Sequence, residues 1–244
     1  MVNDKMVNGS MVHIIMPVKD SLETAEQAIR AIIASGHTFT VYDDYSTPEN
    51  AARLDALQDE LGFRVIHISE HLDHPSPNYR WVLIQAQQEA LQAGLDLVII
   101  ESDVIVRQDT IDKLIVERQK SKDKSPIGLV AAVTVNEEGT INFPYEYAKT
   151  WKEDKVCTKR LSFCCTLLTQ AFLQAYDFHQ LDETKHWYDV HISHTAPKLG
   201  FTNILQITNP VLHKPHSSRP WKQLKYTNPL LYYWRKFTQH RDTI

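Results

Sequence analysis

Two carboxylates separated by one residue follow an apolar run near the middle of the chain. Leu97–Ile100 is typical of a buried strand, and Glu101-Ser102-Asp103 comes directly after it. Because side chains alternate along an extended backbone, both carboxylates can face one cleft. Mg²⁺ and Mn²⁺ prefer carboxylate oxygens and keep coordination positions open for substrate phosphates. The alternative is a solvated turn, since this tripeptide pattern alone is common.

A second acidic motif, Asp43-Asp44-Tyr45-Ser46-Thr47, follows the apolar run Thr38–Tyr42. A carboxylate at this place can accept a hydrogen bond from the N–H of a uracil or guanine ring. Asp44, Ser46 or Thr47 can equally cap the next helix. Taken in isolation, the motif favours capping.

The first hundred residues alternate between apolar runs and segments with helical spacing. This pattern predicts an α/β fold with a mostly parallel sheet and right-handed crossovers. Ligands bind at the carboxyl ends of the strands in such sheets, so we expect both acidic motifs to meet at one edge. Ser21 is the expected N-cap of the first helix. The expected strands are 12–16, 38–42, 63–68 and 97–100, and the expected helices are 21–35, 48–61 and 78–93.

The second half of the chain has less regular patterns. Apolar runs predict strands at 128–135 and 161–168, and one or two strands at 201–213. Short helices are expected at 169–176 and 187–195, the latter ended by Pro197 and Gly200. No repeat and no linker divides the chain, so we expect one folded domain over 12–213 with an unstructured lead at 1–11.

Composition excludes several classes of protein. The chain has 244 residues, 43% hydrophobic and 23% charged, which is typical of a globular protein. A net charge of −4 makes it a poor non-specific binder of nucleic acid. The longest apolar run, 127–135, is too short to cross a bilayer, and the first residues lack the apolar stretch of a secretory signal. Cys157, Cys164 and Cys165 form no CxxC pair, so we expect buried reduced thiols in a cytoplasmic protein.

The C-terminal stretch 214–241 differs from the rest in charge. It holds seven Lys/Arg and no Asp or Glu, with aromatic residues interleaved, whereas the remaining chain has 19 Lys/Arg against 30 Asp/Glu. Such a pattern suits a membrane interface, so peripheral contact with the inner face of a membrane is one expectation for the tail at 214–244. The alternative is an ordinary helix that covers the core while its basic residues face water.

Several weak motifs occur in a specific order and spacing. Pro17-Val18-Lys19-Asp20 closes the first strand, and Asn78 and Gly94 bound the third helix sixteen residues apart. Glu101-Ser102-Asp103 begins seven residues after Gly94. Further on, Gly200 follows Asp189 by eleven residues and precedes His213 by thirteen. Together with Asp43-Asp44-Tyr45-Ser46-Thr47 and Tyr188-Asp189, this arrangement over 12–213 resembles the family 2 glycosyltransferases, nucleotide-sugar-dependent enzymes of the GT-A fold.

The resemblance implies a GT-A-type, Rossmann-like α/β/α sandwich, with a nucleotide-binding half at 12–103 and an acceptor-side half at 104–213. It implies that Asp103 and His213 hold Mn²⁺ or Mg²⁺, with His216 as the alternative to His213. It implies that Asp189 is the general base of a single, inverting displacement. The residues implied to contact the nucleotide are Pro17, Val18, Asp20, Asp43, Asp44, Glu101 and Ser102.

The chain departs from the family pattern at several places that crowd the backbone. Tyr45 and Arg80 stand where the family has glycine, and Ser162-Phe163 replaces a glycine pair. Asp20 replaces Asn, Glu101 replaces the first Asp of the metal motif, and Tyr188 replaces the Glu before the catalytic Asp.

The expected activity is transfer of a sugar from a nucleoside diphosphate sugar to a hydroxyl of a glycan or lipid-linked acceptor, in assembly of a surface polysaccharide or lipid-linked glycan. Two alternatives remain. One is an inactive glycan- or nucleotide-binding paralogue, which the departures at Glu101 and Tyr188 motivate. The other is a sugar nucleotidyltransferase, which requires a glycine-rich loop that Pro17-Val18-Lys19-Asp20-Ser21 lacks.

Overall fold

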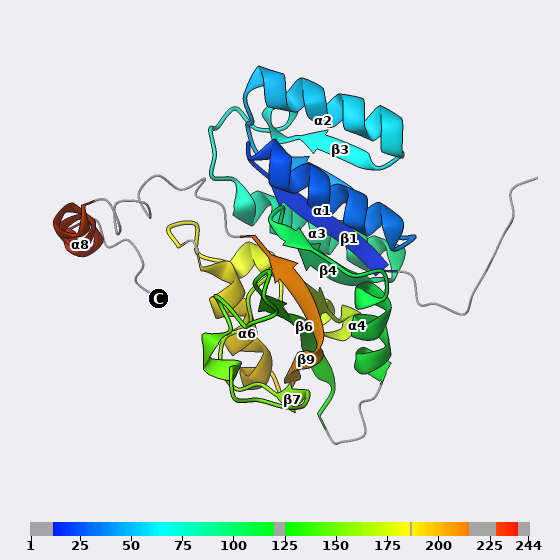
Figure 1. Cartoon of the computed structure of the whole chain (residues 1–244), viewed down its shortest axis with the longest axis vertical. Coiled ribbons are helices and arrows are strands. Elements are labelled where there is room, and N and C mark those ends of the chain that lie inside the picture. Colours follow the sequence, from blue (N-terminus) through cyan, green and yellow to red (C-terminus); the bar gives the residue numbers. More distant parts are fainter. Residues whose placement is uncertain (1–11, 120–124, 186, 215–227, 239–244) are drawn as a thin grey trace, which may run out of the picture.

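The computed structural model describes residues 12–119, 125–185, 187–214 and 228–238. Among them, a nine-stranded sheet is covered by helices on both faces (Figure 1). The strands are β1 (Val12–Val18), β2 (Thr40–Asp43), β3 (Arg64–His67), β4 (Asp96–Ile100), β5 (Val104–Ile105), β6 (Ile127–Val135), β7 (Lys155–Val156), β8 (Cys165–Leu168) and β9 (Thr202–His213). The helices are α1 (Leu22–Ala34), α2 (Pro48–Leu61), α3 (Tyr79–Ala93), α4 (Thr110–Gln119), α5 (Gln170–Ala175), α6 (Tyr188–Lys198) and α8 (Pro229–Thr238), with short 3-10 helices η1 (Ile68–Glu70), η2 (Glu146–Ala148) and η3 (Phe178–Gln180).

The buried side chains form two clusters, one on each face of the sheet. The first cluster packs α3, α5 and α6 against one face, and the second packs α1, α2 and α4 against the other. Strand β1 serves both clusters, since Ile15 belongs to the first and Ile14 and Met16 to the second. The expected α/β/α sandwich is therefore the observed arrangement.

The strand order is β3-β2-β1-β4-β8-β6-β9-β5, with β7 beside β9. The first four strands are parallel, as the alternating pattern predicts. The second half of the sheet is mixed. Strand β8 runs antiparallel to β4 and β6, β9 is parallel to β6, and β5 and β7 are antiparallel to β9.

Helix α2 has the bounds predicted from the sequence, because strong local signals mark both ends. Pro48 occupies the first turn, Thr47 accepts a hydrogen bond from the N–H of Asn50 at 3.4 Å, and Gly62 closes the helix with φ 76°. Ser21 occupies the expected N-cap position of α1. Ser21 has a left-handed backbone (φ 53°), and its side chain makes no capping hydrogen bond to α1.

The irregular second half departs from prediction in three ways. Helix α6 continues through Pro197 to Lys198, and the N–H of Gly200 closes its end on the carbonyl of Pro197. Strand β8 begins only at Cys165, since the N–H and C=O of Ser162 bond instead to the hydroxyl of Tyr145. Helix α4 and the two-residue strands β5 and β7 are absent from the expectations above, although the buried residues of α4 have helical spacing.

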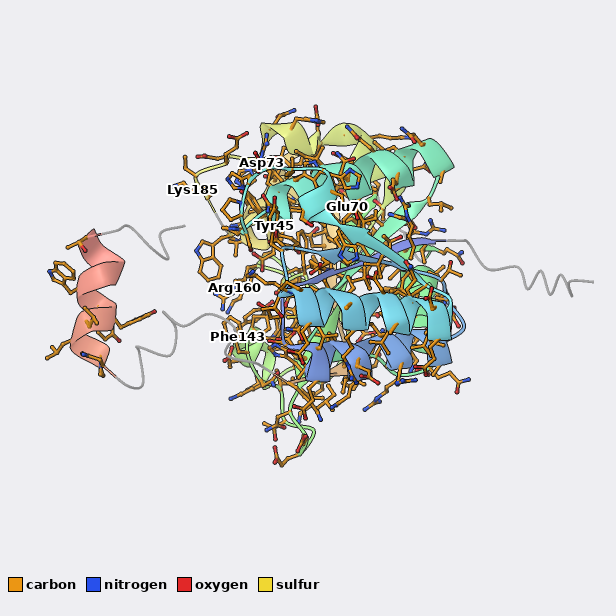
Figure 2. The ribbon with its side chains drawn as sticks, turned by 90° about the horizontal axis from the view of Figure 1, so that it is seen from above. Tyr45, Glu70, Asp73, Phe143, Arg160 and Lys185 are labelled. Atoms are coloured by element: carbon orange, nitrogen blue, oxygen red, sulfur yellow. The ribbon has the colours of Figure 1, made fainter. Side chains whose placement is uncertain are left out.

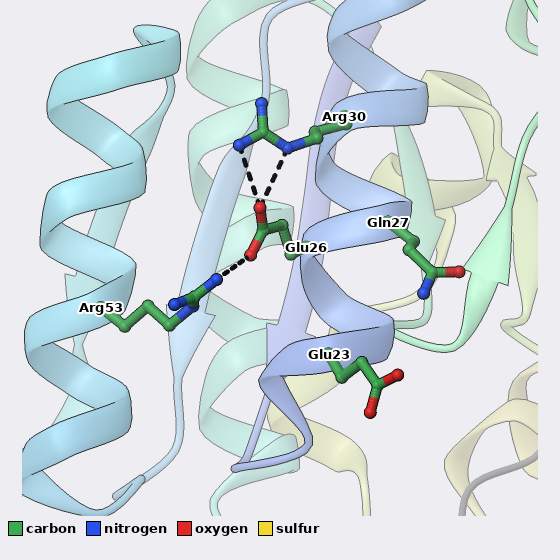
Figure 3. A pocket seen from close by; sticks show the side chains of 5 residues that line it. All are labelled: Glu23, Glu26, Gln27, Arg30 and Arg53. Carbon is green, nitrogen blue, oxygen red and sulfur yellow. Dashed lines mark hydrogen bonds and ion pairs between the residues drawn. The ribbon is translucent and has the colours of Figure 1, made fainter.

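The outer faces of α1 and α2 enclose a charged groove of about 460 Å³ (Figure 3). Glu26 pairs with Arg30 at 2.9 Å and with Arg53 at 2.5 Å, and Arg30 also pairs with Glu60 at 3.1 Å. The groove therefore presents arginines that carboxylates already neutralise. It is lined by these helices alone, which separates it from the acidic motifs that follow β2 and β4.

No helix in the described parts of the chain is both long and apolar enough to cross a bilayer. The expectations for 1–11, for His216 and for most of 214–241 lie outside the described residues.

Candidate active site

The loops that follow the strands place five labelled side chains along one side of the domain. Figure 2 shows Asp73, Lys185, Tyr45, Arg160 and Phe143 along this side, from segments far apart in the sequence. Tyr45 follows β2, and Phe143 and Arg160 come from the segments between β6 and β8. The edge of the sheet predicted to bind ligand is therefore bordered by loops from both halves of the chain.

The end of β1 is fixed to the loop after β2. Val18 lies opposite Asp43 in the parallel ladder, and its carbonyl accepts a hydrogen bond from the N–H of Asp44 at 2.8 Å. The carboxylate of Asp20 accepts hydrogen bonds from the N–H of Thr47 at 2.9 Å and from the Asn50 amide at 3.0 Å. The bond from Thr47 is the main reason that the pKa of Asp20 is lowered. Asp20 thus joins the end of β1 to the start of α2, and Pro17, opposite Tyr42, lies beside them.

Asp43 is buried and holds His67. Its Oδ2 lies 2.8 Å from Nδ1 of His67, and its Oδ1 accepts the N–H of Ser46 at 3.1 Å. The other ring nitrogen of His67 lies 2.9 Å from Asp55 of α2. Burial alone would lower the pKa of His67, but the hydrogen bonds to Asp55 and Asp43 together outweigh it, and the pKa is raised.

A shallow depression of about 390 Å³ opens beside the contacts of His67 with Asp43 and Asp55. It lies between α2 and the segment that contains β3 and η1. Its lining includes Asp43, Asp55, His67 and two residues labelled in Figure 2, Tyr45 and Glu70. Asp43 therefore lines the depression while both of its oxygens bond to the protein.

Asp44 organises the start of α3 rather than capping α2. Its carboxylate accepts hydrogen bonds from Ser76 Oγ at 2.7 Å, from the N–H of Asn78 at 3.0 Å and from the Asn78 amide at 2.7 Å. Thr47 is the cap of α2. Of the capping interpretations considered for this motif, the one for Thr47 is confirmed.

Tyr45 occupies a backbone conformation that favours glycine, the residue found there in the resembling family. Its φ is 61°, which brings Cβ close to backbone atoms and costs about 1–2 kcal/mol for a residue other than glycine. The phenol offsets this cost because it donates to the carbonyl of Leu72 and accepts the N–H of His74 at 3.0 Å. Tyr45, which crowds this turn in place of glycine, therefore also links the turn by hydrogen bonds to the segment after η1.

Glu101 is attached to β8 through both backbone and side chain. Its N–H bonds to the carbonyl of Cys164 at 3.0 Å, and its Oε2 accepts from Cys164 Sγ at 3.3 Å. Poor solvation of the carboxylate, followed by repulsion from Asp103 and Asp189, raises the pKa of Glu101 to about 7. Ser102, next in the motif, is buried.

Asp103 and His213 meet through strand pairing. Val104 of β5 lies opposite His213 of β9, and the N–H of Lys214 bonds to the carbonyl of Asp103 at 2.9 Å. Asp103 Oδ2 is therefore 3.5 Å from Nε2 of His213. The two residues that the resemblance assigns to a metal are adjacent in space.

The orientation of the His213 ring follows from its second nitrogen. Nδ1 lies 2.8 Å from the carbonyl oxygen of Phe143, so this nitrogen must carry the proton and donate it. In the neutral ring, Nε2 then has the free lone pair and faces Asp103. A hydrogen bond of this kind from the second nitrogen is typical of histidines that bind metal ions.

Asp189 lies in the first turn of α6, as expected from the sequence. It is near enough to Glu101 to raise the pKa of that carboxyl group. Arg80 fixes the segment before α6 by donating to the carbonyls of Leu181 at 2.7 Å and His179 at 2.6 Å. Tyr188 donates to the carbonyl of Asp182 at 3.2 Å in the same segment.

Cys164 is the member of this site that the sequence analysis misses. All three cysteines are free and buried, as expected. However, Cys164 Sγ, a carboxylate oxygen of Glu101 and a ring nitrogen of His213 all lie within 4.8 Å of one another. No local spacing could have shown this, because antiparallel pairing of β4 with β8 and of β5 with β9 brings the three together.

Comparison with known proteins identifies the fold. No model of a protein family matches the sequence, and no curated protein sequence matches it. Solved structures do match. S. aureus TarS 1-349 aligns with a TM-score of 0.62 at 15% identity, over 84% of this chain and 60% of that one. Glucosyl-3-phosphoglycerate synthase (GpgS) from Mycobacterium tuberculosis, in complex with Mn²⁺, UDP and phosphoglyceric acid, aligns with a TM-score of 0.56 at 18% identity, over 89% and 74%.

The chain has the GT-A fold. The fold class expected from the motif spacing is thereby confirmed. A TarS structure in complex with UDP also matches, with a TM-score of 0.61 over 88% of this chain and 63% of that one. The chain thus spans less than two thirds of the TarS structures that it matches.

Tyr45 provides a test of the strained turn. We expect Tyr45→Ala to be less stable than Tyr45→Gly by about 1 kcal/mol, because both lose the phenol but a φ of 61° is strained only for alanine, which has a Cβ. The measurement is urea denaturation of both variants and the wild type. Equal stability of the two variants would show that this turn is not strained.

His67 provides a test of pH dependence. Because its pKa is raised above the ordinary 6.5, the stability that it contributes is present below that value and is lost as the pH rises through the raised value. The free energy of unfolding should therefore differ between wild type and His67→Gln by about 1 kcal/mol more at about pH 5.5 than at about pH 8.5. His179→Gln, which alters an exposed histidine whose ring lies 2.8 Å from the carboxylate of Asp177, is the matched control. If the difference in free energy of unfolding between wild type and His67→Gln does not change with pH, His67 does not link Asp43 to Asp55 as a charged group.

Proposed function

We propose that this chain is a family 2 glycosyltransferase that moves a sugar from a nucleoside diphosphate sugar to a hydroxyl acceptor, with inversion and with a divalent metal ion. The observation that carries the proposal is the pairing of Asp103 with His213 at 3.5 Å, with Glu101 and Asp189 nearby, in a GT-A fold. The complexes of TarS with UDP and of GpgS with Mn²⁺ and UDP-glucose support a nucleotide-sugar donor.

The donor nucleotide is proposed to bind at the ends of β1, β2 and β4. Pro17, Val18 and Asp20 would border the base, together with Asp43 and Asp44. The protein already bonds to the carboxylates of these aspartates. In this proposal they shape and rigidify the pocket at least as much as they contact the base. Glu101 and Ser102 would lie toward the ribose.

The residues at the end of β4 fit a divalent ion. Asp103 offers a hard oxygen, and His213 presents Nε2 because Phe143 fixes its other nitrogen. A bound Mn²⁺ or Mg²⁺ would offset the negative charge that develops on the leaving diphosphate. Asp103 and His213 would hold the ion, and Glu101, as the longer replacement of an aspartate, would support it or bind the ribose.

Asp189 is the proposed general base. It would accept the proton of the acceptor hydroxyl as that oxygen attacks the anomeric carbon opposite the departing diphosphate. A single displacement inverts the anomeric centre and requires one base. Arg80 and Tyr188 would act as positioning residues, since their hydrogen bonds fix the segment that precedes α6.

The acceptor is proposed to be a glycan or a lipid-linked sugar at a membrane surface. In α8, Leu230, Tyr233 and Trp234 are 85%, 49% and 62% exposed, so this helix leaves large apolar side chains in water. The surrounding sequence 214–241 is basic and has no acidic residue. An apolar and basic segment of this kind suits peripheral contact with an anionic membrane.

Nucleotide binding tests the donor site. With Mn²⁺, UDP at about 100 times its dissociation constant should stabilise the wild type by about 2.7 kcal/mol, and Asp103→Asn should lose this gain. Thermal unfolding with UDP, GDP, dTDP or CDP, each with Mn²⁺ or with EDTA, measures the effect and shows which base is bound.

Asp109→Asn is the matched control for that experiment, because Asp109 is exposed and forms an ion pair with Lys113 of the same helix end at 2.8 Å. It should retain the metal-dependent stabilisation. If no nucleotide stabilises the wild type, the donor site does not exist, and a glycan-binding protein without activity becomes the better interpretation.

Asp189→Asn tests the general base. It should lower the rate of UDP release from UDP-sugar in the presence of acceptors by about 10²–10⁴-fold while leaving nucleotide stabilisation intact. Asp177→Asn, which changes an exposed aspartate bonded to His179, should leave the rate unchanged. Equal rates for Asp189→Asn and the wild type would remove Asp189 from this role.

A further inference from the structure

The site contains a donor atom that the proposed transferase reaction does not use. Cys164 Sγ lies with an oxygen of Glu101 and a nitrogen of His213 in a group whose ligand atoms are all within 4.8 Å of one another. Cys164 and His213 are buried, and Glu101 is partly exposed. A thiol, an imidazole and a carboxylate therefore converge at one partly accessible point.

The separation of the sulfur from the carboxylate oxygen is close to that in a tetrahedral metal centre. With Zn–S near 2.3 Å and Zn–O near 2.0 Å, a tetrahedral angle separates sulfur from oxygen by about 3.5 Å. Cys164 Sγ and Glu101 Oε2 are 3.3 Å apart.

The backbone holds these ligands where a metal ion would need them. The N–H of Glu101 bonds to the carbonyl of Cys164 at 3.0 Å, so the two residues cannot separate without breaking the contact between β4 and β8. The carbonyl of Phe143 fixes the ring of His213.

We propose that Glu101, Cys164 and His213 bind a thiophilic divalent cation, with Zn²⁺ as its representative. Thiolate ligands select such ions, whereas Mg²⁺ and Mn²⁺ prefer sites made of oxygen. When the sulfur binds the ion, the thiol proton leaves to solvent. The inference concerns the same site as the proposed function but depends on these three ligands alone.

Sharing of His213 has a direct consequence. The ring presents one nitrogen to the site. That nitrogen can bind either an ion that is also held by Cys164 or an ion that is also held by Asp103, but not both at once. Zn²⁺ is therefore expected to compete with Mn²⁺ for the protein.

Cobalt spectroscopy tests the proposal on the full chain. Co²⁺ added to the wild type should give an intense thiolate-to-cobalt charge-transfer band that saturates at one ion per chain and disappears when Zn²⁺ is added. Cys164→Ser should abolish the band and weaken Zn²⁺ binding by at least about 10-fold. Cys157→Ser, which alters another buried cysteine, should keep both.

A second variant covers the case in which Cys164→Ser does not fold. The chain has three cysteines, so Cys157→Ser combined with Cys165→Ala leaves Cys164 as the sole thiol. This variant should retain the band, which would assign it to Cys164 without any change at that residue. Circular dichroism of each variant verifies folding.

A wild type without the band, or a band that persists in folded Cys164→Ser, would overturn the proposal. The thermal stabilisation of the protein by nucleotides is measured in a separate experiment. A band without stabilisation by any nucleotide supports the thiolate site and counts against the transferase. Stabilisation by UDP and Mn²⁺ without a band supports the transferase and removes Cys164 from the metal centre.

Discussion

The short pairing of β5 with β9 determines the geometry of the site. Two residues of β5 suffice, because Val104 opposite His213 brings Asp103 beside the imidazole. The carbonyl of Asp103 is also bonded to the N–H of Lys214, so the ladder continues past both side chains. Without this pairing, the acidic end of β4 would border the sheet with no imidazole beside it.

A second constraint is electrostatic. Glu101, Asp103 and Asp189 come from two distant segments, and their mutual repulsion contributes to the raised pKa of Glu101. Packing of α6 against the sheet and the hydrogen bonds of Arg80 to the preceding segment keep these groups close despite that repulsion. Such clustering of like charges is common at functional sites and is relieved when a cation or a proton is bound.

The sequence predicts the first half of the fold well because its signals are local. Thr47, Pro48 and Gly62 mark the two ends of α2, and each acts within one turn of the helix. The site is predicted less completely, since its contacts are long-range. Only the family resemblance predicted that Asp103 and His213 lie in one site, and nothing in the sequence indicated that Cys164 differs from an ordinary core thiol. Ser21 occupies the predicted N-cap position, but its residue type does not indicate its left-handed backbone, and its side chain makes no capping hydrogen bond.

Departures from the family pattern have structural functions of their own. Tyr45 and Arg80, both in places of glycine, bind backbone groups of neighbouring segments. They add rigidity around the site where glycines would leave freedom. The chain therefore replaces backbone flexibility by side-chain contacts at two points on the border of the site.

The position of β9 in the chain has a consequence for biosynthesis. The parallel strands β1 to β4 pair with one another and are all made early, so this part of the sheet can form while the rest is still being translated. The imidazole of His213 is the last of the proposed metal ligands to leave the ribosome. A nascent chain thus carries an acidic end of β4 that has no histidine beside it until β9 inserts beside β6, so the proposed metal site would be completed only at that stage.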